Sequence, residues 1–595
     1  MKNAEKDRQI LKAADRYADR SRKEHEKFVR QYKEGIAPVE HSSVVTRANR
    51  TFSYVNLQLA VLYAQGPGLD VESRGSGKLD GMEALSAFGI ADTEEDARQK
   101  FAETMHDVLT YSYDETCSFI ANTACLFDGL VRGLGVTKSG WDAAREIDRA
   151  DAVPRHDLYV DPHARNDIGE ARYVIHTVLQ GIEEARAFFD SIGYVGPPIE
   201  PNFSLVEDDR DTLEGAMARQ FGPENDKDCF KFHEMWGKDG ERRTLKYFSQ
   251  TQEKEFLIER PWPFVLDAED FPFELLVFNT QHAMVMDAFS DLYEGEQLQR
   301  AYEELVEFFH RRVKRSIAKK IILDGDLFSE EHVAQLQNAK DMEFVRVKLD
   351  GKPAKEYIHL VDFNADVDVA VDMADKLKAI YDELLGFDEL LRGAPGVGKT
   401  AREAEIRQQW TQLRIDRKQK AIDGWLTRQA RHRAQIARQL MPAASVARIV
   451  DRAGAFLWEV MGRNPQDLLA EYTVRVQAGS TGEGAKRERM NRLMTMYDRM
   501  MATNAQTGVA VFDLTALALD IFRQAGEKNP EKYLLAPTMP PPAMGPGGTA
   551  SQGISQPPGV NAPGRPGMPG MPGMPGMAGM SGQAGAPGVD ATGAG

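Results

Sequence analysis

The pattern that most constrains the fold is the segment from Gly393 to Thr400, GAPGVGKT, which matches the phosphate loop G-x-x-x-x-G-K-[ST]. In a phosphate loop, backbone N–H groups and the lysine bind phosphates, and the glycine-rich turn directly follows a buried β-strand. The residues before this segment, DKLKAIYDELLGFDELLR, carry charges at helical intervals and no β-branched run. The sequence therefore predicts a mobile glycine-rich loop joining two helices.

The nucleotide-binding alternative also needs a carboxylate for Mg²⁺ after a second apolar strand. Asp513, after Val509–Phe512, is the available candidate, but it leads directly into TALALDIF. We interpret Asp513 as the N-cap region of a helix. A phosphate-loop NTPase acting on nucleic acid remains the alternative hypothesis.

The composition is that of a folded protein with an acidic surface. The chain has 595 residues, 42% of them hydrophobic, and a formal net charge of −17. Three cysteines exclude a disulfide framework or a four-cysteine zinc site, and they favour a reducing compartment. The N-terminus lacks an apolar signal region, and nowhere do 18 apolar residues run together, so we expect neither secretion nor a membrane span.

The C-terminal segment 541–595 cannot build a core, because it holds 16 Gly and 11 Pro but only two charged side chains. Glycine recurs at every third position from Gly564 to Gly588, the period of collagen. Eight triplets would form only a short triple helix. We therefore expect a disordered Gly/Pro/Met-rich tail.

The rest of the chain predicts a mainly helical α+β fold. Helices are expected in the charged arm before Gly35, over 50–65, over 93–132 starting at Thr93, over 287–323, and through most of 366–526. Between 150 and 285 short β-like runs, ARYVIHTVL, KFHEMWG, RTLKYFS and FELLVFN, predict a compact α+β insert. A hairpin is expected over 343–362, with Asp350-Gly351 at its turn.

Basic side chains gather on two of the expected helices. Residues 399–438 carry 11 Lys/Arg against 4 Asp/Glu, so this stretch is either a solvated face or a surface that binds a polyanion. The helix over 287–323 carries acids early and bases late, which matches the helix dipole. The basic residues of this helix that are candidates for facing DNA are Arg311, Arg312, Lys314 and Arg315.

No pattern reaches the level of a catalytic signature, so we predict no catalytic residue, cofactor or metal. The cluster His156, Asp157, Asp161 and His163 contains possible metal ligands, but its flanking prolines and irregular spacing favour polar loop residues. Cys117 and Cys125 fall on one expected helix and are interpreted as core residues.

Six local patterns, taken in order, resemble the portal, or head-to-tail connector, proteins of tailed bacteriophages, in a podovirus-like form. They cover most of residues 50–535. They are NRTFSYVNLQLAVLYAQGPGLDV, CLFDGLVRGLGVTKSGWD, DPHARNDIGEARYVIHTVL, EDFPFELLVFN, TAREAEIRQQ and GEKNPEKYL. The Gly-Lys-Thr sequence departs from the family, which needs no phosphate loop.

The resemblance implies a portal-type wing, stem, clip and crown architecture. The expected division is 1–109 (N-terminal arm and wing), 110–144 (first stem helix), 145–285 (clip, the α+β insert), 286–324 (second stem helix), 325–399 (wing and channel loop), 400–540 (inner wing helix and crown) and 541–595 (disordered tail).

The resemblance also implies a non-enzymatic ring of about twelve subunits at one capsid vertex, through which double-stranded DNA enters and leaves. The expected partners are terminase, tail adaptor proteins, and capsid and scaffolding proteins, in a virion assembled in the host cytoplasm. DNA would be handled without sequence specificity. The candidate channel-loop residues are Gly393, Gly396, Gly398, Lys399 and Arg402. A non-enzymatic capsid or scaffold component is the second alternative.

Overall fold

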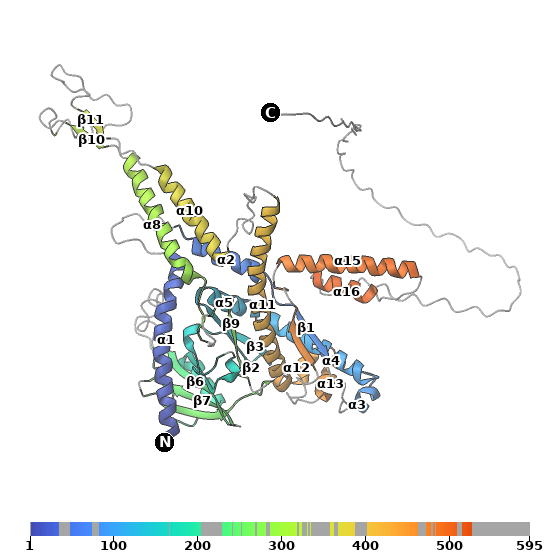
Figure 1. The fold of residues 1–595 in the computed structure, drawn as a ribbon. Coiled ribbons are helices and arrows are strands. Elements are labelled where there is room, and N and C mark those ends of the chain that lie inside the picture. The colour runs from blue at the N-terminus through green and yellow to red at the C-terminus, as the bar shows by residue number, and fades with distance from the viewer. Residues whose placement is uncertain are drawn as a thin grey trace, which may run out of the picture. The chain divides into compact units, whose positions relative to one another are not determined.

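The computed structural model describes most of the chain up to residue 525. The described ranges are 2–34, 48–73, 82–165, 167–203, 229–240, 242–251, 253–267, 270–280, 286–317, 320–323, 330, 334, 358–361, 367–386, 401–461, 472–477, 480–481, 483–507 and 514–525. By its contacts the chain divides into 1–528 and 529–595, and the second unit, with the predicted tail, lies outside the described residues. The first unit is α+β and mainly helical, as predicted (Figure 1).

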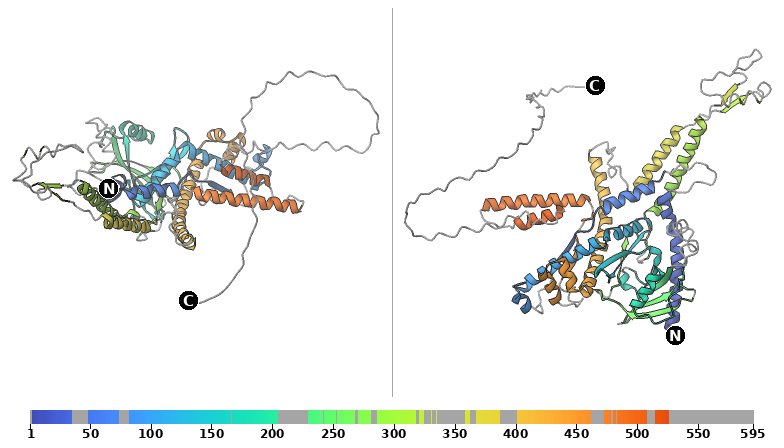
Figure 2. Two further views of the ribbon diagram at one scale, coloured as in Figure 1. Left: turned by 90° about the horizontal axis from the view of Figure 1, so that it is seen from above. Right: turned by 180° about the vertical axis from the view of Figure 1, so that it is seen from behind.

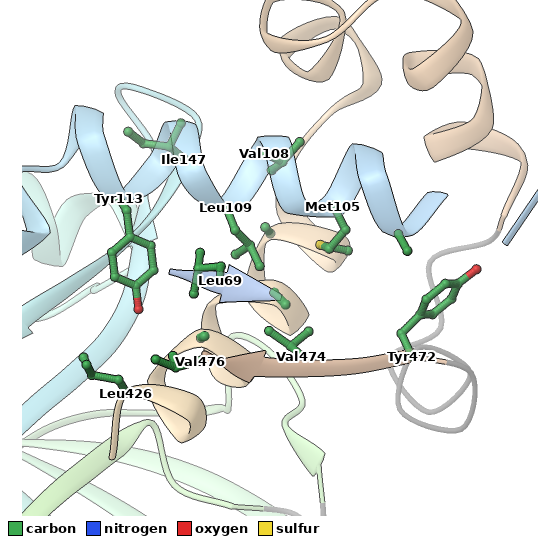
Figure 3. Packing of buried hydrophobic residues seen from close by; sticks show 14 of the residues in the cluster. Leu69, Met105, Val108, Leu109, Tyr113, Ile147, Leu426, Tyr472, Val474 and Val476 are labelled. Carbon is green, nitrogen blue, oxygen red and sulfur yellow. The ribbon is translucent and has the colours of Figure 1, made fainter. Parts of the chain in front are cut away.

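The largest core joins segments from both halves of the chain. It is built from α2 (Arg50–Leu62), β1 (Leu69–Ser73), α3 (Met82–Ala87), α4 (Glu94–Glu115), α5 (Ser118–Val131), α11 (Ala401–Leu440), α12 (Ala443–Ile449), α13 (Arg452–Val460) and β12 (Tyr472–Val476). Strands β1 and β12 pair antiparallel, with Leu69 opposite Val476. Figure 3 shows how α4 lies over this strand pair, with Met105 and Leu109 pointing toward it. The early segment from α2 to α5 therefore shares one core with the chain's later helices.

The helix expected over 93–132 is interrupted. Thr93 caps α4 as predicted, because its hydroxyl accepts a hydrogen bond from the Asp96 N–H at 3.2 Å. The helix then breaks at Cys117, whose φ of 50° lies in the left-handed region. Cys125 is buried as expected, but Cys117 is exposed at the junction of α4 and α5 rather than in the core.

The predicted α+β insert contains two antiparallel sheets. The first has the order β3-β2-β9, formed by β2 (Leu134–Asp142), β3 (Ile147–Ala152) and β9 (Phe273–Val277). The second has the order β4-β5-β6-β7-β8, formed by β4 (Leu158–Val160), β5 (Tyr173–Gly181), β6 (Cys229–Asp239), β7 (Arg242–Ser249) and β8 (Phe256–Pro261). Two 3₁₀ turns, Arg155–Asp157 and Ile168–Glu170, and α6 (Ile182–Ser191) complete it. All four β-like runs of the sequence are strands.

The five-stranded sheet is covered on both faces. Alternate residues such as Phe232 and Trp236 pack into a core with α6, while Ile175 and Met235 point to the opposite face. The N-terminal helix α1 (Lys2–Glu34) covers that opposite face through Leu11, which is fully buried. The charged N-terminal arm is therefore docked on the insert along one apolar stripe.

The remaining elements lie after the insert. They are α8 (Leu292–Ile317), β10 (Lys320–Leu323), β11 (Ile358–Val361), α10 (Val367–Leu385), α15 (Glu483–Thr507) and α16 (Leu514–Ala525). Among the described residues of 366–526, helices dominate as predicted, and β12 is a strand. In the hairpin predicted over 343–362, only 358–361 is described, and this strand pairs with β10. No helix in the described part of the chain has the length and apolar character needed to cross a bilayer.

Candidate functional site

Helices α8 and α10 lie side by side and antiparallel (Figures 1 and 2). A Cβ atom built at Gly295 of α8 would lie 3.1 Å from Tyr381 and 3.6 Å from Leu385 of α10, so the absence of a side chain lets the helices approach closely. Leu298 of α8 belongs to the same apolar cluster. The start of α8 therefore packs against the end of α10.

A small strand pair joins the other ends of these two helices. β10 begins three residues after α8 ends, β11 ends six residues before α10 begins, and Lys320 lies opposite Val361 in the antiparallel register. The segment 318–366 is thus an insert between two packed helices. The expected stem pairing was different: it placed helices near 110–132 and 287–320 on either side of 145–285. In the structure α5 packs mainly against β2, and α8 packs mainly against α10.

A buried ionic cluster connects the start of α8 to α11. Lys418 of α11 and Tyr54 of α2 donate hydrogen bonds to Asp291, just before α8, at 2.6 and 2.7 Å. Asn279 donates a third, at 2.6 Å. Burial would raise the pKa of Asp291, but these donors and the charge of Lys418 outweigh it and hold the pKa below its usual range. The carboxylate is therefore ionised and fully engaged at this junction.

Two further contacts hold the end of α10. Arg50 of α2 forms an ion pair with Asp382, and Arg414 of α11 donates a hydrogen bond to the Glu383 carbonyl at 3.1 Å. The chain then turns at Gly386, whose φ of 71° suits glycine, into the glycine-rich segment. Arg414 thus connects the end of α10 directly to α11, the helix that follows residues 387–400.

The C-terminal half of α11 runs through the core, and its bases bind carboxylates of the same chain. Arg433 and Asp148 are both fully buried and form an ion pair. His432 lies between Glu274, at 2.7 Å, and Asp270, at 3.4 Å. Burial would lower the pKa of His432, but its hydrogen bonds to these acids raise it to about 9. Arg428, which is partly exposed, also forms an ion pair with an acid, Asp167.

These pairings answer part of the question that the basic stretch 399–438 left open. From about residue 418 onward, the bases named above are neither a solvated face nor a surface for an external polyanion, because internal acids neutralise them. The sequence did not reveal this, since the partners lie more than 100 residues away. The burial of α11 had one sequence signal, the apolar residues interleaved with its charges.

The predicted channel-loop residues fall largely outside the described part. Gly393, Gly396, Gly398 and Lys399 are not described, and Arg402 lies in the first turn of α11. The candidate bases Arg311, Arg312, Lys314 and Arg315 all lie in the last two turns of α8, next to the strand pair. Arg311 is exposed and pairs with Glu307 at 3.0 Å.

The possible metal ligands are engaged with protein partners. Asp161 accepts hydrogen bonds from Arg172 at 2.6 Å and contacts His163 at 2.9 Å, while His156 lies 3.6 Å from Asp157. Among the described residues, no three His, Cys, Asp or Glu side chains are grouped so that they could hold a metal ion. These residues therefore form local polar contacts in the loop.

A partly open cavity of about 1730 Å³, lined by described residues, lies between α5, the β2–β3 hairpin and the five-stranded sheet. Its wall includes Lys138, Glu234 and His176, and Lys138 forms an ion pair with Glu234. Burial would raise the pKa of Glu234, but Lys138 and His176 lower it to about 2. Lys138 and Glu234 neutralise each other, and burial lowers the pKa of His176, so the three groups leave no free charge to bind a ligand.

No protein-family model and no curated protein matches this chain.

Proposed function

We propose that the chain is a portal protein of a tailed bacteriophage, one subunit of a ring at a capsid vertex through which double-stranded DNA is packaged and ejected. The observation that carries the proposal is a continuous run of elements. Two packed antiparallel helices, α8 and α10, flank a small β-containing insert, and a glycine-rich segment then leads into the 40-residue helix α11. The proposal also rests on the sequence resemblance to portal proteins.

In this proposal the stem consists of α8 and α10, and the clip is the segment 318–366 between them. This assignment replaces the one expected from the sequence alone, because the resemblance requires a clip between two neighbouring stem helices. The α+β insert of 145–285 and α1 then belong to the wing. The clip would bind terminase during packaging and tail adaptor proteins afterwards, while capsid and scaffolding proteins surround the ring.

The electrostatics are consistent with a channel that lets DNA slide. Each contact between a basic side chain and a DNA phosphate adds salt-dependent affinity for DNA. A ring that binds DNA tightly would therefore stall its translocation. Here the net charge is −17, and two basic residues of α11, Arg433 and Arg428, are already paired with acids. The segment 387–400, with Lys399, is the part of the chain that we assign to the channel, next to Arg402.

The NTPase alternative has less support from the described residues. A phosphate loop follows a buried β-strand, whereas α10 is helical up to Leu385, eight residues before the motif. Under the portal proposal, the terminase would supply the energy for DNA movement, and the chain itself would need no catalytic residue or cofactor.

Negative-stain imaging of the purified full chain, with ATP hydrolysis measured on the same preparation, tests the proposal. We expect rings with an axial hole and no nucleotide turnover. Closed shells or filaments without an axial hole would favour the capsid or scaffold alternative. Robust turnover by monomers or small oligomers would favour the NTPase.

A further inference from the structure

Helix α10 carries a second apolar stripe that does not face α8. Tyr381 and Leu385 pack against α8, and the exposed side chains Met373, Ile380 and Leu384 form another line along the same helix. Their exposed fractions are 54, 49 and 45%. Spacings of seven and four residues place all three on one side of the helix. An exposed stripe with this heptad spacing is typical of a helix that packs against a further helix.

Helix α8 carries exposed aromatic side chains of its own. Tyr293 and Phe308 are 54 and 49% exposed. Arg300 and Arg311 are also exposed on this helix, and each pairs with an acid one turn earlier, Glu296 and Glu307. On α10, exposed acids directly precede two residues of the stripe, Asp372 before Met373 and Glu383 before Leu384. Exposed charges of both signs lie beside these residues, with Lys376 also next to the stripe on α10 and Glu294 and Glu304 also on α8, so the two surfaces match in apolar character rather than in charge.

The two surfaces also match in height along the helix pair. Because Gly295 packs against Tyr381 and Leu385, Tyr293 lies near the level of Leu384. Phe308 is 15 residues further along α8, about 22 Å at the helical rise. Met373 is 11 residues back along α10, about 17 Å from Leu384. Copies placed side by side at equal height would thus bring Phe308 near Met373 and Tyr293 near Leu384.

We propose that the stripe of Met373, Ile380 and Leu384 packs against the Tyr293–Phe308 face of α8 in a second copy of this chain. The inference rests on the proposed portal function, and it specifies the surfaces that join neighbouring subunits at the stem. Two different faces of one helix pair meet, so the contact is heterologous. Repetition of a heterologous contact gives a ring when the rotation closes, whereas a contact between two copies of α10 would stop at a dimer.

Disulfide trapping tests this contact. In a chain with Cys117→Ser and Cys229→Ser, the pair Phe308→Cys and Met373→Cys is oxidised and separated on a non-reducing denaturing gel. We expect a ladder that continues beyond the dimer, because every subunit bonds two neighbours. The matched control pairs Phe308→Cys with Val371→Cys, which lies at the same level on α10, is 42% exposed, and faces away from the stripe. A product that stops at the dimer, no cross-link, or an equal ladder in the control would overturn the proposal.

A second variant set measures assembly directly. Ile380→Lys combined with Leu384→Lys should abolish the ring population in mass photometry while leaving the circular dichroism spectrum of the chain unchanged. Val371→Lys should assemble like the wild type. Rings that persist in the double variant would overturn this interface and leave the portal function standing. A wild-type chain that stays monomeric would overturn both.

Discussion

Lys418 of α11 donates a hydrogen bond to Asp291 across 2.6 Å, and this ion pair links the long core helix to the residue that precedes α8. Both side chains are largely buried, with 16 and 19% of their surface exposed. The ammonium group of Lys418 also lies 5.6 Å from the ring centre of Tyr54. The contact joins elements 127 residues apart and sets where the helix pair begins.

Replacing Lys418 with methionine should destabilise the chain, because Asp291 would then lose the cation that offsets its burial. We expect a loss of about 2 kcal/mol in the free energy of unfolding, less than for a fully buried pair because some surface remains exposed. Lys420→Met is the control: this lysine is exposed on the same helix and should change stability by no more than about 0.5 kcal/mol. The measurement is urea unfolding of the wild type and the two variants. Equal unfolding midpoints in all three would contradict the role assigned to Lys418.

His432 predicts how stability depends on pH. Its pKa is about 9 in the folded chain, above the ordinary value of 6.5, so the folded state binds the proton more tightly. This contribution is fully present below pH 6.5 and is lost as the pH rises through 9. The difference corresponds to stabilisation on the order of 3 kcal/mol. Unfolding midpoints of wild type and His432→Gln between pH 6 and pH 9.5 should converge as the pH rises, and a constant difference would refute the assignment.

Gly135 is required by the close approach of β2 to α5. A Cβ atom at this position would lie 2.2 Å from the Cys125 carbonyl oxygen, which the helix backbone cannot move aside cheaply. Gly135→Ala should therefore lower the free energy of unfolding by about 2 kcal/mol or more. Gly140 lies on the same strand with nothing within 4 Å of its Cβ position, so Gly140→Ala serves as the control. Thermal unfolding that shifts equally in both variants would argue against this steric explanation.

Lys399 separates the portal and NTPase hypotheses. In a phosphate-loop enzyme this lysine stabilises charge on the transferred phosphoryl group, and alanine in its place abolishes turnover. The portal hypothesis predicts that neither the wild type nor Lys399→Ala hydrolyses ATP, that both form rings, and that any defect is confined to DNA packaging or retention. The measurements are ATP hydrolysis, Mg-nucleotide binding and imaging of both proteins. Turnover in the wild type that disappears in the variant would favour the enzyme.

Truncation after residue 540 should leave ring assembly intact, because the removed segment has almost no charge and no core-forming periodicity. Mass photometry and imaging of the truncated chain provide the measurement. If rings form but infectivity falls, the tail is an interaction segment. Rings that fail to form would show that the tail takes part in assembly.

The sequence by itself determined the features that depend on local periodicity. The alternating runs of 171–179, 231–237 and 243–249 form strands, Thr93 caps a helix, and residues 375–385, the described part of the stretch before the glycine-rich motif, are helical. Local patterns were insufficient at Cys117, where a left-handed residue breaks the helix expected over 93–132. Local patterns also did not indicate whether the basic residues of α11 face solvent, bind a polyanion or pair with acids of the same chain.

Only the tertiary structure decided which distant elements meet. The pairing of α8 with α10 rather than with a helix near 110–132 depends on the close approach of residues such as Gly295 and Tyr381, which lie 86 residues apart. Arg433 and Asp148 carry no sequence sign that they form a buried pair, since a charge pattern records neither burial nor partner. Short-range periodicity sets which face of each helix is apolar. The partner of that face is selected by shape and charge complementarity among all elements at once, which exists only in the folded chain.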